Sequence, residues 1–240
     1  MPRRPQPIGS RTNPLLFPNL RSRRLGQISV KSCGCPHRLY LLVCLLEEQV
    51  AMSTTRNRLI DAMKRLLWQR GYDATSPNQV LEASGAGKGS LYHHFDGKRE
   101  LAIVAMESRA DEILGEAKHI FDGPGTYLEK FEKYLLIPRN GLEGCRLGRI
   151  VQDPSVVEDN QLQRPLKRYF ERLHGIMEEE FELARQNGDL VSSISSSQLA
   201  IMVISSVQGG FVISRANNDG DLIRVATRGI YSFLVSLSTA

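Results

Sequence analysis

The feature that most restricts the fold of this sequence is a pair of short helical segments between residues 76 and 95. Ser76-Pro77-Asn78-Gln79 has the composition of a helix start, with a serine N-cap, a proline at the first helical position and a glutamine that completes a capping box. Gly85 ends this helix early, and Gly85-Ala86-Gly87 predicts a tight turn. Residues 88–94 suit one further short helix. Two short helices joined by a glycine turn indicate a helix-turn-helix unit.

Longer helices are predicted on either side of this unit. The segment that opens at Ser53 carries apolar residues at three- and four-residue spacing, and Gly71 follows it as a glycine past a helix C-terminus should. A long helix is predicted from Asp96-Gly97 to about Phe121. The apolar positions of the first segment are Leu59, Ile60, Met63, Leu66 and Leu67.

The rest of the chain also has helical periodicity. We predict four helices, over residues 126–137, 159–187, 199–216 and 221–238. No segment after residue 52 requires a strand.

Residues 1–51 differ from the remainder in charge. They hold eight basic and two acidic residues, whereas residues 52–240 hold 23 basic and 24 acidic residues, so the excess of positive charge belongs to the N-terminal segment. We expect residues 1–51 to be a disordered or misannotated extension. The apolar run 39–46 could also serve as the core of a secretory signal, although Glu47-Glu48 stands where a small-residue cleavage site should be. Translation from Met52 is the favoured interpretation.

Cysteine usage indicates neither a disulfide framework nor a metal site. Four cysteines in 240 residues fit a reducing compartment. Cys33-Gly-Cys35-Pro-His37 and Cys44 have a closer spacing than the paired cysteines of zinc sites, and incidental cysteines are the favoured interpretation. We expect no metal and no other cofactor. No run of 18 apolar residues occurs, so no membrane association is expected.

Three motifs carry a resemblance to a known family. Gly71-Tyr72-x-Ala74-Thr75, then Gly85-x-Gly87-Lys88-Gly89-Ser90-Leu91-Tyr92-His93-His94-Phe95, then Lys98-x-Glu100-Leu101 resemble the DNA-binding domain of the TetR (tetracycline-repressor) family. One departure is Gly87, where members often carry serine or threonine, but glycine is a tolerable cap.

The resemblance implies an all-α fold in two domains. Residues 52–100 would form an N-terminal three-helix DNA-binding domain that contains the helix-turn-helix. Residues 101–240 would form a C-terminal helical domain for effector binding and dimerisation. Residues 52–100 hold eight basic and five acidic residues, whereas the second domain is net acidic, which suits this division.

Candidate DNA contacts lie around the predicted recognition helix. Small residues near its start let backbone amides approach phosphate, and Lys88 can meet guanine or phosphate. Lys98 heads the next helix, where family members use such a lysine against phosphate. Lys88 and Lys98 taken alone would be ordinary solvated lysines. The candidates are Thr75, Ser76, Lys88, Gly89, Ser90, Tyr92, His93 and Lys98.

Candidate effector contacts are indicated mainly by helical spacing. Side chains at helical spacing could line an apolar pocket, although such stripes more often form core. The candidates are Phe131, Tyr134, Cys145, Phe170, His174, Met177, Met202 and Phe211.

Cys145 has a second interpretation. Gly144-Cys145-x-x-Gly148 resembles a motif of one TetR subgroup that includes regulators responding to reactive electrophiles. Arg146 and Arg149 would favour the thiolate. The alternative is a small buried packing residue.

These observations predict a cytoplasmic, ligand- or stress-responsive transcriptional regulator, most simply a repressor. The resemblance implies a homodimer, built through the last two helices, that binds a palindromic double-stranded DNA operator and a small-molecule effector. A thiol-based electrophile or redox sensor acting through Cys145 is the alternative. An enzyme is not expected, because no nucleophile–base constellation follows residue 52. A non-regulatory DNA-binding protein is also disfavoured, since it would lack the large second domain.

Overall fold

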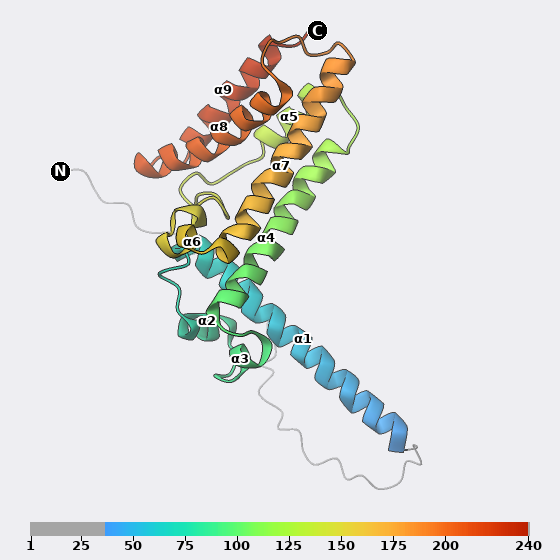
Figure 1. The fold of residues 1–240 in the computed structure, drawn as a ribbon, viewed down its shortest axis with the longest axis vertical. Helices are drawn as coiled ribbons and strands as arrows, with labels where there is room; N and C mark the ends of the chain where they lie inside the picture. Colours follow the sequence, from blue (N-terminus) through green and yellow to red (C-terminus); the bar gives the residue numbers. More distant parts are fainter. Residues whose placement is uncertain (1–36, 240) are drawn as a thin grey trace, which may run out of the picture. The chain divides into compact units, whose positions relative to one another are not determined.

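A computed structural model describes residues 37–239, with side chains from residue 54 onward (Figure 1). This part of the chain consists of helices and the loops between them, and contains no strand beyond one isolated bridge between Leu190 and Ser238. The all-α prediction is confirmed.

The first three helices are α1 (His37–Arg70), α2 (Pro77–Ser84) and α3 (Ser90–His94). Helix α1 begins at His37, well before the start expected at Ser53. The expected domain boundary at residue 52 stays a prediction, and residues 1–36 lie outside the described residues. The predicted cysteine and signal-sequence features before residue 54 likewise have no described side chains.

The predicted start of α2 is confirmed in atomic detail. Gln79 donates its backbone N–H to the Ser76 hydroxyl (3.3 Å), and the Ser76 backbone N–H donates to the Gln79 side-chain oxygen (2.8 Å). Gly85 ends the helix in the left-handed conformation at φ +62°. Local hydrogen bonding therefore fixes both ends of α2.

Helix α1 supports the helix-turn-helix from one side. Its inner face is buried against α2 and α3 in a core that includes Leu59, Met63, Val80, Leu91 and Phe95. Its outer face contributes two arginines: Arg58 donates to the Gly85 carbonyl (3.1 Å) and Arg65 donates to the Ala83 carbonyl (3.1 Å). These bonds satisfy carbonyls at the end of α2 that have no helical partner.

The second part of the described chain contains five longer helices. They are α4 (Lys98–Phe121), α5 (Tyr127–Leu135), α7 (Asn160–Gln186), α8 (Ser196–Ala216) and α9 (Leu222–Ser236). Helices α4 and α7 run side by side, and α8 packs between α7 and α9 (Figure 1). All five agree with the sequence prediction to within a turn or so at each end.

Two short elements were not predicted from the sequence. The 3-10 turn η1 (Ile150–Gln152) and the helix α6 (Pro154–Glu158) fold the segment between α5 and α7. Each element buries one side chain, Ile150 in η1 and Val156 in α6, whereas the neighbouring residues are largely exposed. Arg149 and Asp153 of this segment bind the end of α1 and the turn after it.

Helix α8 is long and apolar enough to cross a membrane by length and composition, with a mean hydropathy of 1.5. In the structure, 44% of this stretch is buried, and Leu199, Val203 and Val207 pack into the core. The apolar character of α8 is therefore used in part by contacts with α7 and α9.

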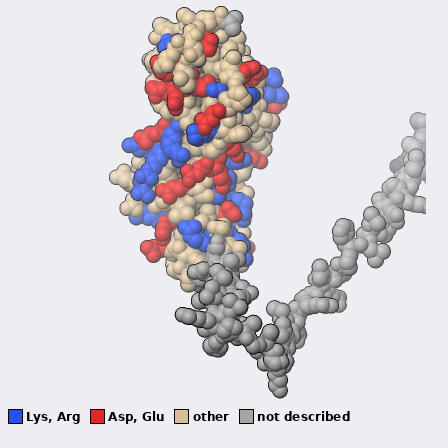
Figure 2. All heavy atoms as spheres, turned by 90° about the vertical axis from the view of Figure 1, so that its right-hand side faces the viewer, with Lys and Arg blue, Asp and Glu red and all other residues tan. Residues whose placement is uncertain are grey.

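Charged side chains of both signs are interspersed over the face that contains α4 and α7 (Figure 2). Two ion pairs join these helices: Arg164 lies 3.7 Å from Glu107, and Arg172 lies 3.0 Å from Asp111. Exposed pairs of this kind contribute little to stability, about 0–1 kcal/mol each.

Candidate DNA-binding surface and effector cavity

Helix α3 is anchored on one side and exposed on the other. Leu91 is fully buried and Phe95 is 3% exposed, so these two residues hold α3 on the core. Tyr92 is 67% exposed, and His93 and Lys88 are also exposed. An aromatic side chain so exposed on a short helix is free to contact a partner, as expected of a recognition helix.

Of the two candidate DNA contacts at the N-terminal end of α2, only one has an exposed side chain. Ser76 is exposed, but Thr75 is 1% exposed and its hydroxyl donates to the Gly71 carbonyl (2.7 Å). The Thr75 side chain therefore braces the turn after α1. Thr75 as a DNA contact stays a prediction, since only its position before α2 and not its hydroxyl faces a partner outside the fold.

Lys98 lies at the start of α4 over the ring of Tyr72, with 4.0 Å between its Nζ atom and the ring centroid. Burial lowers the pKa of Lys98, while the nearby carboxylates of Asp73 and Asp153 raise it. The lysine is thus positioned by an aromatic face and two acids. Gly89 and Ser90 lie at the start of α3, where Gly89 is the N-cap residue without a side-chain bond.

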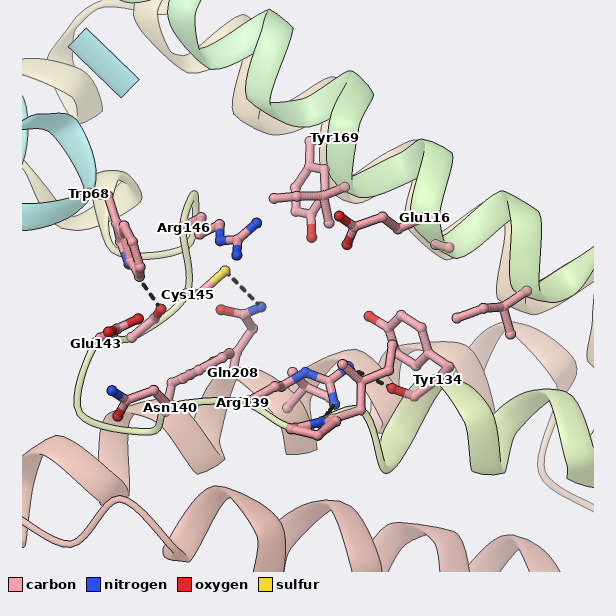
Figure 3. Close-up of a pocket in the computed structure, with 18 residues that line it drawn as sticks. Trp68, Glu116, Tyr134, Arg139, Asn140, Glu143, Cys145, Arg146, Tyr169 and Gln208 are labelled. Atoms are coloured by element: carbon pink, nitrogen blue, oxygen red, sulfur yellow. Dashed lines mark hydrogen bonds between the residues drawn. The ribbon is translucent and has the colours of Figure 1, made fainter. Parts of the chain in front are cut away.

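A cavity of about 290 Å³ lies between the end of α1 and the longer helices (Figure 3). Its walls come from α1, α4, α5, α7, α8 and the loop after α5. Of the predicted effector contacts, Tyr134, Cys145 and Phe211 line it. Phe170 lines a neighbouring cavity of about 390 Å³, to which Cys145 and Phe211 also belong.

The other four predicted contacts line neither cavity. Phe131 and Met177 are fully buried in the core, where the Phe131 ring stacks on Phe181 with 4.2 Å between centroids. His174, in the middle of α7, pairs with Ser197 in the first turn of α8, and Met202 packs against the core. Helical periodicity identifies the inward face of a helix, but it does not distinguish a filled core from a cavity.

Seven polar or aromatic wall residues escaped the sequence analysis. They are Trp68, Glu116, Arg139, Asn140, Glu143, Tyr169 and Gln208. The sequence could have indicated Gln208 as a cavity residue, because it is an amide within a largely apolar helix. It could not have indicated Trp68, because the helix that contains Trp68 is predicted to belong to the DNA-binding domain.

Two tyrosine hydroxyls belong to the cavity wall. Burial raises the pKa of both Tyr134 and Tyr169, so both are neutral hydroxyls at physiological pH. Tyr169 is 3% exposed, and its hydroxyl points into the cavity (Figure 3). A hydroxyl that faces a cavity can orient a ligand there by a hydrogen bond.

Cys145 has different neighbours from those expected. Its Sγ atom accepts the Gly148 backbone N–H (3.2 Å) and the Gln208 side-chain N–H (3.4 Å). A Cβ atom at Gly148 would collide with the Gln208 side-chain oxygen, so glycine here lets Gln208 keep its position beside the sulfur. The thiol therefore sits in a prepared pocket of N–H donors.

The two arginines beside Cys145 are used elsewhere. Arg149 donates to the backbone carbonyls of Trp68 (3.0 Å) and Gln69 (2.5 Å). The guanidinium of Arg146 lies over the Trp68 ring, 5.6 Å from its centroid. Both arginines therefore bind the end of α1.

The comparisons with known proteins agree with this arrangement. Residues 59–105 match the family model described as "Bacterial regulatory proteins, tetR family". The HTH-type transcriptional regulator LmrA of Bacillus subtilis is 26% identical over 181 residues, which cover 72% of this chain and 93% of LmrA. The HTH-type transcriptional repressor KstR2 of Rhodococcus jostii is 34% identical over 68 residues, or 28% of this chain and 33% of KstR2. Reduced NemR of E. coli has the same fold, with a TM-score of 0.66 and 18% identity over 73% of this chain and 95% of NemR.

A helix-turn-helix with an exposed recognition helix, carried on a helical domain with a cavity, defines a DNA-binding transcriptional regulator rather than an enzyme. Residues 59–105 form a DNA-binding domain of the TetR family, and the chain is similar over most of its length to regulators that carry this domain.

Proposed function

We propose that this regulator is a repressor that binds a twofold-symmetric operator as a homodimer and leaves it when a small molecule occupies the 290 Å³ cavity. The observation that carries the proposal is the position of the cavity, because one of its walls, Trp68, belongs to the helix that supports the helix-turn-helix. A bacterial regulator of this kind acts in the cytoplasm, where its DNA lies. The similarity of 68 residues of this chain to KstR2, a transcriptional repressor, supports the same assignment.

The proposed dimer uses the outer faces of α8 and α9. These faces expose apolar side chains that no described residue covers: Ile201, Val212, Ile213, Val225 and Val235 are between 45% and 64% exposed. Two adjacent helices with such faces suit a four-helix bundle with a second copy. A twofold dimer can place two α3 helices in successive major grooves, about 34–36 Å apart.

The effector is a molecule of modest size with both apolar and polar surface. The aromatic and aliphatic walls include Trp68 and Phe211, while Tyr169 and Glu116 offer polar groups. Such a combination orients a ligand by a few polar contacts within an apolar site.

The first experiment identifies the operator. Full-length protein is used to select duplexes from a random pool, and gel shifts then compare binding to the selected duplex with binding to a scrambled one. We expect preference for the selected duplex. Equal binding to both would show a non-regulatory DNA-binding protein.

The effector is then sought by fluorescence, because Trp68 is the only tryptophan of the chain. A compound that changes Trp68 emission and releases the selected duplex is an effector of this cavity. Tyr169→Phe should weaken its binding by about two- to twelvefold, since a net hydrogen bond contributes about 0.5–1.5 kcal/mol. Tyr127→Phe, a buried tyrosine away from the cavity, is the matched control.

The second candidate function is thiol-based sensing of electrophiles. It is favoured by one observation: Cys145 lines the cavity, where its sulfur accepts hydrogen bonds from two N–H groups and is within reach of a molecule in the cavity. In this case a small electrophile should release the wild-type protein from DNA, while the Cys145→Ser protein stays bound. Equal release of both proteins, or release only by an unreactive ligand, would make Cys145 a packing residue.

A further inference from the structure

The neighbouring cavity of about 390 Å³, which we call the second cavity, differs from the first cavity in its charge. The residues that line the first cavity include two glutamates and two arginines, whose charges balance. Of the described residues that line the second cavity, two are arginines, Arg149 and Arg215, and none is acidic. A hollow with an excess of positive charge attracts an anion.

Arg215 lies in the last turn of α8. In the part of the chain that the structure describes, no carboxylate pairs with its guanidinium. The position of the guanidinium is defined by the backbone beside it, because a Cβ atom at Gly144 would lie 3.2 Å from the Arg215 Nη1 atom. Gly144 immediately precedes Cys145, which lines the same cavity. Arg215 therefore places an unneutralised positive charge close to the Cys145 thiol.

Arg149 is only partly used by its contacts with α1. Its Nη1 atom donates to two backbone carbonyls there, whereas its Nε and Nη2 atoms make no hydrogen bond to a described residue. Burial lowers the pKa of Arg149, the positive charge of Arg215 lowers it further, and the carboxylate of Asp153 opposes both effects. Asp153 does not line the second cavity. The two guanidinium groups therefore repel each other at a cavity that has no acidic wall residue to separate them.

The other walls of the second cavity suit the body of an organic molecule. Phe170 of α7, Phe211 and Val212 of α8, and Val151 of η1 provide apolar surface. A volume of about 390 Å³ is within the usual range for small-molecule sites. The second cavity thus combines apolar walls with two cationic groups.

We propose that the second cavity binds a small organic acid, whose anionic head lies between Arg149 and Arg215 and whose apolar body lies against Phe170 and Phe211. A guanidinium can bind a carboxylate through two parallel hydrogen bonds, and one anion would remove the repulsion between the two arginines. The bound acid would cover the sulfur of Cys145. The proposal goes beyond the proposed function, and it is tested without DNA.

The first test measures which charge is attracted to Cys145. Full-length protein with Cys33→Ser, Cys35→Ser and Cys44→Ser keeps Cys145 as its only thiol. It is treated with two methanethiosulfonates of similar size, one that ends in a sulfonate and one that ends in a trimethylammonium group. In both reactions the thiolate attacks the divalent sulfur of the reagent, a disulfide forms, methanesulfinate leaves and the thiol proton goes to solvent. Each rate constant is divided by that of the same reagent with β-mercaptoethanol at the same ionic strength.

We expect the normalised rate constant of the anionic reagent to exceed that of the cationic reagent by at least about tenfold, because nearby positive charges attract one and repel the other. Arg215→Gln should lower this ratio by at least about threefold, whereas Arg215→Lys keeps the charge and should retain most of it. Sedimentation confirms that both variants keep the assembly of the parent protein, since Arg215 lies close in the chain to Val212 of the proposed dimer face.

Arg146→Gln is the matched control for a diffuse positive potential. Arg146 follows Cys145 directly in the chain, but its guanidinium lies over the Trp68 ring, and it lines the first cavity and not the second. We expect Arg146→Gln to lower the ratio less than Arg215→Gln does.

The second test uses a reversible acid. Hydrocinnamate and hydrocinnamyl alcohol have the same apolar body, and only the first carries a charge. Each is added over a concentration series before N-ethylmaleimide, an uncharged reagent whose ring carbon bonds to the Cys145 sulfur while the adjacent carbon takes a proton. We expect hydrocinnamate to slow this reaction more than the alcohol does, and we expect Arg215→Gln to remove the difference.

Four results would overturn the proposal. In the first test they are a normalised ratio near one in the parent protein, and equal falls in Arg146→Gln and Arg215→Gln. In the second test they are equal protection by the acid and the alcohol, and no protection by the acid. Because neither test uses DNA, these failures would leave the repressor assignment untouched, and a failure to find a selected duplex would leave the organic-acid site untouched.

Discussion

Among the individual side chains, Tyr92 and Lys98 are the clearest candidates for positioning the protein on DNA. Tyr92 is 67% exposed, and Lys98 is held over Tyr72 at the start of α4. We expect Tyr92→Ala and Lys98→Ala to weaken DNA binding without a change in preferred sequence, because phosphate contacts position a protein but do not specify bases. The salt dependence should fall by about one unit of slope for Lys98→Ala. Gel shifts across a salt series measure both effects, and Lys167→Ala, an exposed lysine on α7, is the control. A new sequence preference with an unchanged slope would contradict the assignment.

Asp159 allows a prediction about pH. The hydrogen bond from Arg99 holds the pKa of Asp159 at about 2, below its ordinary value of 3.8, and the backbone N–H groups of Gln161 and Leu162 add to the shift. A depressed pKa in the folded protein means that the ionised carboxylate stabilises the fold above pH 3.8, and that this contribution is lost as pH falls toward 2. We expect NMR titration of the carboxyl carbon to give a midpoint near 2. In Arg99→Met the midpoint should move upward, and an unmoved midpoint would assign the shift to the helix N-terminus alone.

The helices show which features can be predicted locally. The limits of α2 follow from Ser76, Pro77, Gln79 and Gly85, because all the bonds that fix them lie within ten residues. The cavity does not follow in this way. Its wall combines Trp68 with residues up to Phe211, and only the folded chain brings them together.

The same distinction explains the two missed elements. Helix α6 and η1 are too short to produce a periodic pattern in the sequence. Long-range contacts hold them in place, because Asp153 binds the turn after α1 and Arg149 binds a carbonyl in the last turn of α1. Three of the eight predicted effector contacts line the cavity: Tyr134 and Phe211 come from helical stripes, and Cys145 comes from its motif. Of the others, Phe131 and Met177 fill the core, and Phe170 lines the neighbouring cavity.

Two glycines at helix ends allow the cost of backbone strain to be compared with the cost of strain combined with a close contact. Gly71 and Gly85 both end helices with positive φ, at +84° and +62°. A Cβ atom at Gly85 meets nothing within 4 Å, whereas at Gly71 it would meet Asp153. We expect Gly85→Ala to cost about 1 kcal/mol, from strain alone. Gly71→Ala should cost roughly 3 kcal/mol, because it also weakens the charged hydrogen bond from Tyr72 to Asp153. Urea unfolding measures both, and equal costs would show that the hydrogen bond from Tyr72 to Asp153 contributes nothing to stability.

In the whole molecule, the proposed homodimer makes affinity for DNA depend on assembly. In that proposal one recognition helix reads half of a twofold operator, and the second half-site is engaged as an intramolecular event only when two copies are joined. The joining surface we propose is the exposed apolar face of α8 and α9. A substitution there should therefore reduce DNA binding although it lies far along the chain from α3.

Val225→Glu provides the direct test of this dependence. Val225 is 64% exposed on α9, so a glutamate there is solvated in a single copy and is desolvated without a partner in a dimer. Val157→Glu, at a 53% exposed position on α6, introduces the same charge outside the proposed interface. We expect Val225→Glu to sediment as a monomer with an unchanged melting temperature at low concentration, and to lose at least about a hundredfold in affinity for the selected duplex, the lower range for lost bivalency. The Val157→Glu protein should remain dimeric and bind normally. If the Val225→Glu protein stays dimeric, the interface lies on another face; if it becomes monomeric and binds DNA as tightly as before, a single recognition helix suffices and the twofold operator is wrong.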